Sequence, residues 1–146
     1  MYILVDLDNT IADDKWRLQH IKPKVQDAHD RYHDYHTLSA FDECCNRKLF
    51  EVRHTKTIVM TSRPETYKAM TREWLLRNDV PFAMLFMRPK YDLDPSPVLK
   101  KRFVNVLNTL YDIQTKSIFA AYDDRQDVVD AYQSIGIPAR RVAIHD

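Results

Sequence analysis

The sequence predicts an α/β protein in which a parallel β-sheet is covered by helices. Short runs of Ile, Val, Leu and Met alternate along the chain with longer segments whose apolar residues recur at helical spacing. Parallel strands need long crossovers, usually helical and right-handed, and this alternation supplies them. The 146 residues, 45% of them hydrophobic and 29% charged, fit one soluble domain with a buried core. We therefore expect a single domain over residues 1–146.

The first strand is predicted at Ile3-Leu4-Val5 and leads directly into Asp6 and Asp8. Residues two apart in a strand share a face, so the two carboxylates should point the same way. In open α/β sheets, ligands bind at the carboxyl ends of the strands. Two close carboxylates repel each other unless a cation or another partner lies between them. The stretch therefore predicts half of a metal-assisted active site.

Residues 13–52 are predicted to form a small helical insert of two or three helices after the first strand. The segment is polar, rich in His, Tyr, Lys and Asp, and has no strand pattern. Its helical stripes comprise Leu18, Ile21 and Val25, interrupted by Pro23, then His29, Tyr32, His33 and His36, then Leu38, Phe41, Cys45, Leu49 and Val52. The insert is expected either to cap the site or to form the first crossover.

Two features of this insert have alternative interpretations. His29 and His33 have the spacing of helical metal ligands, but no neighbouring Glu or Cys completes a pattern, which favours a solvated polar face. The adjacent Cys44 and Cys45 favour reduced, buried thiols over a catalytic thiolate, because no base is evident.

With no leader or bilayer-length apolar stretch, we expect a cytoplasmic protein without a membrane partner, in the host cytoplasm if its source is viral.

Four further strands are predicted at 57–61, 82–87, 117–122 and 142–144, each an apolar run bounded by turn residues. Polar residues follow three of these strands: Thr61, Ser62 and Arg63, then Arg88, then Asp123 and Asp124. A single Asp or Thr at such a position is a common helix cap. Their joint occurrence at successive strand ends is hard to explain by capping. We expect them to converge with the carboxylates that follow the first strand.

Helices are predicted at 64–77, 98–110 and 126–135. Pro64 suits a first helical turn. The apolar stripes are Met70, Trp74 and Leu75, then Leu99, Phe103, Val106, Leu107 and Leu110, then Val128, Val129 and Tyr132. Gly136 is expected as a left-handed cap. It is the single glycine, which excludes the glycine-rich phosphate loops of Walker-type kinases and dinucleotide-binding folds.

These residues carry a resemblance to the haloacid dehalogenase (HAD) superfamily of aspartyl-phosphate phosphatases. Asp6-Leu7-Asp8-Asn9-Thr10 resembles its motif I, D-x-D-x-T, and Thr61 resembles motif II. Lys100, with Lys101 as the alternative, resembles motif III, and Asp123-Asp124 resembles motif IV. The resemblance implies a three-layer α/β/α Rossmann-like fold whose five-stranded parallel sheet has the order 5-4-1-2-3.

Within the superfamily, the chain is most similar to the 3′-phosphatase domain of bacteriophage polynucleotide kinase. That subgroup has an Arg eleven residues after the nucleophile and another two residues after the motif II hydroxyl, where Arg17 and Arg63 stand. Its motif IV continues Asp-Asp-Arg-x-x-Val-Val, as this chain does from Asp123 to Val129. Two departures are Asn9 in place of the usual Gly, tolerable in a left-handed backbone, and Ser96-Pro97 where the phage enzyme has acidic residues.

The resemblance implies a Mg²⁺-dependent phosphomonoesterase. Asp6 would attack phosphorus to form an aspartyl-phosphate, and Asp8 would act as general acid and then general base. Metal ligands would be Asp6, the backbone carbonyl of Asp8 and one or both of Asp123 and Asp124. Thr61 and Lys100 would hold the transferring phosphoryl oxygens.

The substrate implied is a nucleic-acid 3′ end or a nucleotide. Arg17 and Arg63 would bind a phosphate of the substrate. The alternative interpretation is that both arginines form surface salt bridges. The other substrate contacts expected are Asn9, Thr10, Ser62 and Arg88. A free-standing deoxynucleoside monophosphate phosphatase and a non-catalytic HAD-like binding module are the alternative functions. A separate kinase or ligase polypeptide as partner stays open, as does the oligomeric state.

Overall fold

A five-stranded parallel sheet in the order β3-β2-β1-β4-β5 forms the centre of the computed structural model, which describes all residues 1–146. The strands are β1 (Tyr2–Val5), β2 (Lys56–Pro64), β3 (Phe82–Arg88), β4 (Ile118–Asp123) and β5 (Ala139–Arg141). Every neighbouring pair is parallel. The predicted order 5-4-1-2-3 is thus confirmed, read from the opposite edge. The strand order reverses between β1 and β4, the position at which such sheets bind ligands.

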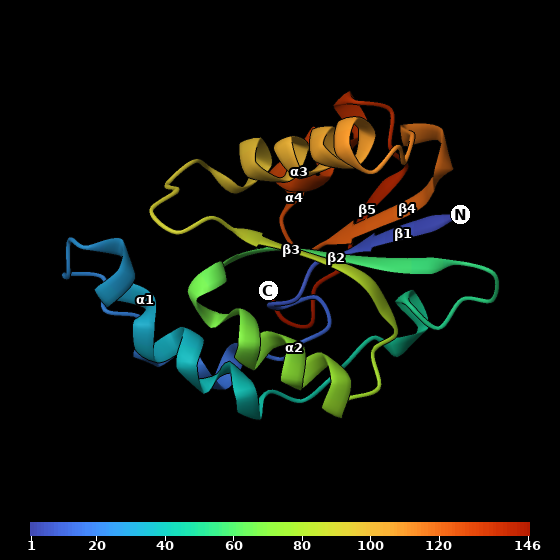
Figure 1. Cartoon of the computed structure of the whole chain (residues 1–146). Helices are drawn as coiled ribbons and strands as arrows, with labels where there is room; N and C mark the ends of the chain where they lie inside the picture. The colour runs from blue at the N-terminus through green and yellow to red at the C-terminus, as the bar shows by residue number, and fades with distance from the viewer.

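Helices cover both faces of the sheet, which confirms the three-layer prediction (Figure 1). Helices α3 (Ser96–Leu110) and α4 (Gln126–Ser134) lie on one face, and α2 (Lys68–Arg77), preceded by the turn η4 (Glu65–Tyr67), lies on the other (Figure 1). A short turn, η5 (Thr115–Ser117), precedes β4.

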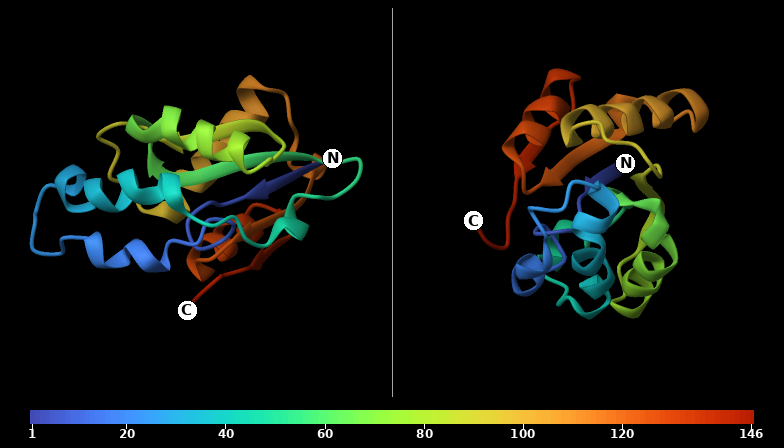
Figure 2. Two further views of the ribbon diagram at one scale, coloured as in Figure 1. Left: turned by 90° about the horizontal axis from the view of Figure 1, so that it is seen from below. Right: turned by 90° about the vertical axis from the view of Figure 1, so that its left-hand side faces the viewer.

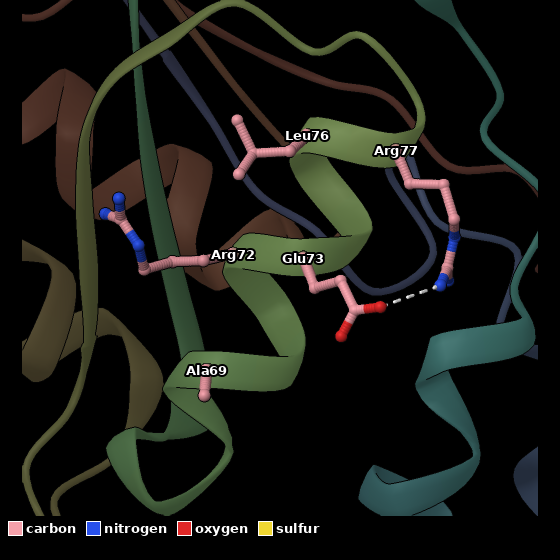
Figure 3. A pocket seen from close by; sticks show the side chains of 5 residues that line it. All are labelled: Ala69, Arg72, Glu73, Leu76 and Arg77. Carbon is pink, nitrogen blue, oxygen red and sulfur yellow. Dashed lines mark hydrogen bonds and ion pairs between the residues drawn. The ribbon is translucent and has the colours of Figure 1, made fainter.

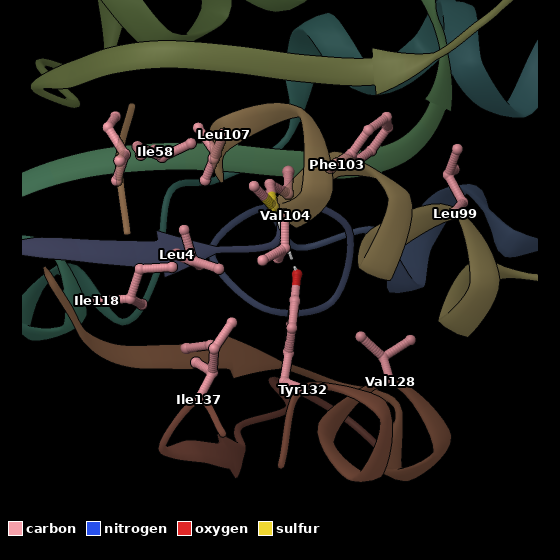
Figure 4. Packing of buried hydrophobic residues seen from close by; sticks show 13 residues of the cluster. Leu4, Ile58, Leu99, Phe103, Val104, Leu107, Ile118, Val128, Tyr132 and Ile137 are labelled. Atoms are coloured by element: carbon pink, nitrogen blue, oxygen red, sulfur yellow. Dashed lines mark hydrogen bonds between the residues drawn. The ribbon is translucent and has the colours of Figure 1, made fainter. Parts of the chain in front are cut away.

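The alternation of side chains along β1 and β2 divides the core between these two faces. Leu4 and Ile58 pack with residues of α3 and α4, as Figure 4 shows. Ile3 and Val59, one residue away in each strand, instead pack with Trp74 of α2. Strands buried on both faces explain why the runs read as continuously apolar.

The insert at 13–52 contains one α-helix and three short 3₁₀ turns. These are η1 (Lys15–His20), α1 (Ala28–Thr37), η2 (Leu38–Phe41) and η3 (Arg47–Leu49), and α1 lies beside α2 below the sheet (Figures 1 and 2). The helix predicted around the histidines is confirmed. The helix predicted from Leu38 to Val52 is wrong, because only the short turns η2 and η3 form there. Phe41, in the middle of the predicted apolar stripe, is 76% exposed. The backbone there bonds elsewhere: Cys45 N donates to the carbonyl of Ile11 at 2.7 Å.

Two predicted boundaries are also corrected. The last strand is Ala139–Arg141 rather than 142–144, because these residues are in register with the end of β4. Beyond it, the chain turns back toward the first strand, and Ile144 N donates to the carbonyl of Asn9 at 2.9 Å. Pro64 ends β2 instead of opening a helix.

Gly136 has a φ of 85°, which confirms the predicted left-handed cap. No helix has both the length and the apolar character needed to cross a membrane.

Candidate active site

The carboxylate of Asp6 lies at the carboxyl end of β1, bonded to a buried lysine. Lys100 Nζ donates to Asp6 Oδ1 at 3.0 Å, to Asp123 Oδ2 at 2.7 Å and to the carbonyl of Met60 at 2.7 Å. Burial lowers the pKa of Lys100, but Asp123 and Asp6 outweigh it, so the net pKa lies above the usual range. Lys101 is exposed. Of the two lysines considered for motif III, Lys100 therefore faces the site.

Three carboxylates meet at this point, each offering an oxygen within 4.8 Å of the others: Asp6, Asp123 and Asp124. Burial, and then the charge of Asp123, raise the pKa of Asp6 well above its usual range despite Lys100. The same two causes raise the pKa of Asp124. A buried all-oxygen cluster with excess negative charge fits a hard divalent cation such as Mg²⁺.

Asp8 is surrounded by positive charge. Arg17 Nη2 and Arg63 Nη2 each donate to Asp8 Oδ1 at 2.5 Å. Burial raises the pKa of Asp8, but Arg63 and Arg17 together outweigh it and hold the pKa well below its usual range. Both arginines are buried, at 0% and 3% exposure, which contradicts the surface salt-bridge alternative. Asp8 is therefore an anion in this arrangement.

Further hydrogen bonds fix the two arginine side chains, and they come from residues that the sequence analysis did not single out. Arg17 Nε and Nη2 donate to the buried Asp42 carboxylate at 2.9 and 2.7 Å, and Arg17 Nη1 donates to the carbonyl of Tyr35 at 2.9 Å. Arg63 Nη1 donates to Thr71 Oγ1 at 2.9 Å, whereas Arg63 Nε is buried without a partner. The contact between Asp42 and Arg17 spans 25 residues of chain, so local spacing gave no signal for it.

Two predicted hydroxyls lie in the buried part of the site. Thr10 Oγ1 donates to Asp6 Oδ2 at 3.3 Å. Thr61 Oγ1 accepts from the backbone N–H of Arg63 at 3.1 Å, so its own hydrogen stays available to a ligand.

Two further expected substrate contacts, Ser62 and Arg88, are already engaged in hydrogen bonds within the protein. Ser62 Oγ shares a 2.7 Å hydrogen bond with Ser96 Oγ. Arg88 donates to the carbonyls of Ser62 at 3.0 Å and Asp94 at 2.7 Å, which fixes the loop after β3.

Asn9 has a φ of 62°, in the left-handed region in which Asn replaces Gly most readily. Its side-chain nitrogen donates to Asp124 Oδ2 at 3.1 Å, and its oxygen accepts from the backbone N–H of Ile144 and His145 at 3.1 and 2.8 Å. The residue therefore ties the motif I turn both to the acidic cluster and to the end of the chain.

The remaining candidates from the sequence are not part of the carboxylate site. Burial raises the pKa of Cys44 and of Cys45, which disfavours a catalytic thiolate. His33 Nδ1 shares a 2.8 Å hydrogen bond with the hydroxyl of Tyr67, so the face that carries it is not simply solvated. A hollow of about 750 Å³ lies on the outer side of α2 and contains none of the predicted site residues (Figure 3). Its lining is Ala69, Arg72, Glu73, Leu76 and Arg77.

Comparison with known structures supports the fold. A chain of the Pnkp1/Rnl/Hen1 complex aligns over 99% of this chain with a TM-score of 0.70 and 21% identity. The protein spans 46% of the length of that chain. A HAD family enzyme from Bacteroides thetaiotaomicron, in complex with magnesium and inorganic phosphate, aligns over 99% of this chain and 96% of its own (TM-score 0.60, 15% identity).

A HAD-superfamily hydrolase from Geobacter sulfurreducens aligns over 94% of this chain and 84% of its own, with a TM-score of 0.60 and 14% identity. No curated protein sequence matches significantly. The family described as the polynucleotide kinase PNKP phosphatase domain matches residues 1–146. Together with the geometry of Asp6, Asp8 and Lys100, this whole-length match places the chain in that family, so it is a HAD-type phosphatase domain.

Proposed function

We propose that the protein is a Mg²⁺-dependent phosphomonoesterase that removes phosphate from a nucleic-acid 3′ end through an aspartyl-phosphate intermediate. The observation that carries the proposal is the separation of two neighbouring aspartates into different environments. Asp6 is bonded to Lys100 within the acidic cluster, whereas Asp8 is paired with Arg17 and Arg63. Carboxylates in such different environments suit different roles in one reaction.

In this proposal Asp6 is the nucleophile. Its Oδ1 accepts a hydrogen bond from Lys100, while its Oδ2 accepts only the long 3.3 Å bond from Thr10 and keeps a lone pair for phosphorus. Lys100 stays protonated and offsets the repulsion that an incoming phosphate meets from the acidic residues. The hydroxyl hydrogen of Thr61 is free to donate to a phosphoryl oxygen.

In this proposal Asp8 is the general acid when the aspartyl-phosphate forms and the general base when water hydrolyses it. A substrate phosphate competes with Asp8 for Arg17 and Arg63, and the unpartnered Nε–H of Arg63 adds a donor. Once the arginines turn toward the phosphate, the pKa of Asp8 rises, so Asp8 takes up a proton from solvent and donates it to the leaving oxygen. Donation of that proton leaves Asp8 as a carboxylate, which then accepts a proton from the water that hydrolyses the aspartyl-phosphate.

The residues fitted to hold Mg²⁺ are Asp6, Asp123 and Asp124, with the backbone carbonyl of Asp8 as a further ligand. When bound, the ion neutralises negative charge on the phosphate and on the acidic cluster. Asn9 orients Asp124 for this role through its hydrogen bond to Asp124 Oδ2.

A nucleic-acid end is favoured as substrate by the family to which the chain belongs, and a deoxynucleoside monophosphate is the alternative. The alternative of a non-catalytic binding module is disfavoured because the sequence retains every carboxylate of motifs I and IV as well as Lys100.

The structural likeness to the Pnkp1/Rnl/Hen1 complex supports a kinase or ligase partner. The free Cys44 and Cys45 fit the reducing cytoplasm.

The test compares phosphate release from a 3′-phosphorylated oligodeoxynucleotide, its 5′-phosphorylated counterpart and deoxynucleoside monophosphates, with Mg²⁺ and with EDTA. We expect turnover of the 3′-phosphate with Mg²⁺ only, and a loss of at least about 10³-fold in Asp6→Asn. Lys100→Ala should lose roughly 10²–10³-fold, and the matched control Lys101→Ala should keep activity. Preference for the monophosphates would select the alternative substrate, and unchanged turnover in Asp6→Asn would refute the covalent mechanism.

A further inference from the structure

Helix α1 presents a row of rings toward a tyrosine of η4. His29, Tyr32, His33 and His36 recur at helical i, i+3, i+4 and i+7 spacing, and Tyr67 lies against the three histidines. The ring of Tyr67 lies 5.0 Å from that of His36, 5.8 Å from that of His33 and 6.4 Å from that of His29, centroid to centroid. The rings of His29 and Tyr67 are nearly parallel, at 9°. These five residues are termed the ring platform.

Core packing accounts for Tyr67, which is 4% exposed, but not for the histidines that lie against it. His29 and His33 are exposed, so their rings add nothing to a buried core. His36 is only 9% exposed, yet its Nδ1 is buried without a hydrogen-bond partner, an arrangement that proteins normally avoid. Burial lowers the pKa of His36 to about 3, so this ring is neutral and stacks as a polar aromatic.

The platform is contiguous with the proposed phosphate site. The ring of His36 lies 5.0 Å from that of Tyr35, and the guanidinium of Arg17 lies 4.2 Å from the centroid of the same Tyr35 ring. Arg17 in turn donates to Asp8 at 2.5 Å. From His36 to His29 the helix rises about 10 Å, roughly the reach of one nucleotide. Figure 2 shows α1 alongside α2.

We propose that the exposed His29 and His33 rings of the platform stack against the base of the 3′-terminal nucleotide while its phosphate occupies the site at Asp6. This inference rests on the proposed function and specifies its substrate as a single-stranded 3′ end with an unstacked terminal base. The base is the flat, uncharged part of such an end, and Tyr and His rings stack with any base regardless of sequence. The guanidinium of Arg31, 6.0 Å from the Tyr32 ring, adds positive charge at the edge of the platform.

The test uses two 3′-phosphorylated single-stranded oligodeoxynucleotides that differ only at the last nucleotide, which carries its base in one and is abasic in the other. The wild-type protein should prefer the substrate with the base, by roughly 5- to 150-fold in kcat/KM. The double variant His29→Ala/His33→Ala should lose this preference through a higher KM, with the abasic substrate affected less than about threefold.

Two matched controls isolate stacking. His29→Phe/His33→Phe keeps flat rings and should keep most of the preference. Asp34→Asn, which alters an exposed ion pair with Lys22 elsewhere on α1, should leave it unchanged. Equal turnover of the two substrates by the wild-type protein, or an equal loss on both in the alanine variant, would overturn the platform alone. Turnover of neither substrate would overturn the proposed function and the platform with it.

Discussion

At the scale of the residue, motif I separates two carboxylates that are only two positions apart. Asp6 has a raised pKa because burial and Asp123 disfavour its charge, with Lys100 opposing them. Burial also acts on Asp8, but Arg63 and Arg17 reverse the sign of the shift. The difference therefore comes from the partners that the fold brings to each residue and not from the aspartates themselves.

Asp42 positions Arg17 without touching Asp8, which gives a prediction for Asp42→Asn. The exchange keeps the shape but removes the charge that pairs with Arg17 Nε and Nη2, so the variant should lose about 3 kcal/mol of unfolding free energy. Because Arg17 is then less well fixed, kcat on a 3′-phosphate should fall about tenfold. Urea denaturation and steady-state kinetics measure the two effects.

The control for this prediction is Trp16→Phe. It removes the other donor to Asp42, an indole N–H at 3.0 Å from Asp42 Oδ1, but leaves the ion pair intact. This variant should lose no more than about 1 kcal/mol and keep its activity. Equal effects of Asp42→Asn and Trp16→Phe would show that the charge of Asp42 is unimportant.

At the scale of the element, the turn after β1 joins parts of the chain that are distant in sequence. Asn9 bonds to Asp124, after β4, and to the backbone of residues 144 and 145. The terminal segment therefore packs on motif I instead of extending the sheet, which is why the predicted last strand lay three residues too far along.

Substitutions at Asn9 separate the backbone contribution of this turn from its hydrogen bonds. Asn9→Gly keeps access to the left-handed φ but loses the side-chain bonds, and should destabilise the fold by about 2 kcal/mol. Asn9→Ala loses both and should be a further ~1 kcal/mol less stable. Urea denaturation of the two variants gives the difference. If Ala is as stable as Gly, the left-handed backbone is not under strain at this position.

At the scale of the whole molecule, the acidic residues gather where the strand order reverses. Asp6 follows β1 and Asp123 ends β4, which are paired neighbours on either side of the switch point. The fold therefore gathers three carboxylates around the single ammonium of Lys100, and the excess negative charge is unfavourable without a further cation.

Mg²⁺ should consequently stabilise the folded protein. At a concentration about 100-fold above its dissociation constant, bound Mg²⁺ adds about 2.7 kcal/mol and should raise Tm by roughly 5–10 °C over the protein in EDTA. Differential scanning calorimetry measures the shift. Asp124→Asn should lose most of it. A shift that persists in that variant would place the ion elsewhere, for example at the separate cluster of Asp13, Glu43 and Cys45.

The sequence by itself determined the α/β class, the number of strands and the identity of most carboxylates at the site. These follow from local signals: apolar runs of strand length, helical periodicity, and polar residues immediately after strands. The motif I and motif IV residues were predictable because each belongs to a short, continuous segment. The left-handed backbone at Asn9 was predictable for the same reason.

Only the tertiary structure decided what those residues contact. Lys100 and Lys101 differ by one residue, and the rotation of α3 against the sheet places Lys100 on Asp6 and leaves Lys101 in solvent. Asp42 reaches Arg17 because the insert folds back on itself between η1 and the end of η2. The helices expected around Phe41 failed because backbone pairing with the segment after β1 outweighed a local apolar stripe. Contacts between distant segments depend on the packing of the whole chain, which local spacing does not encode.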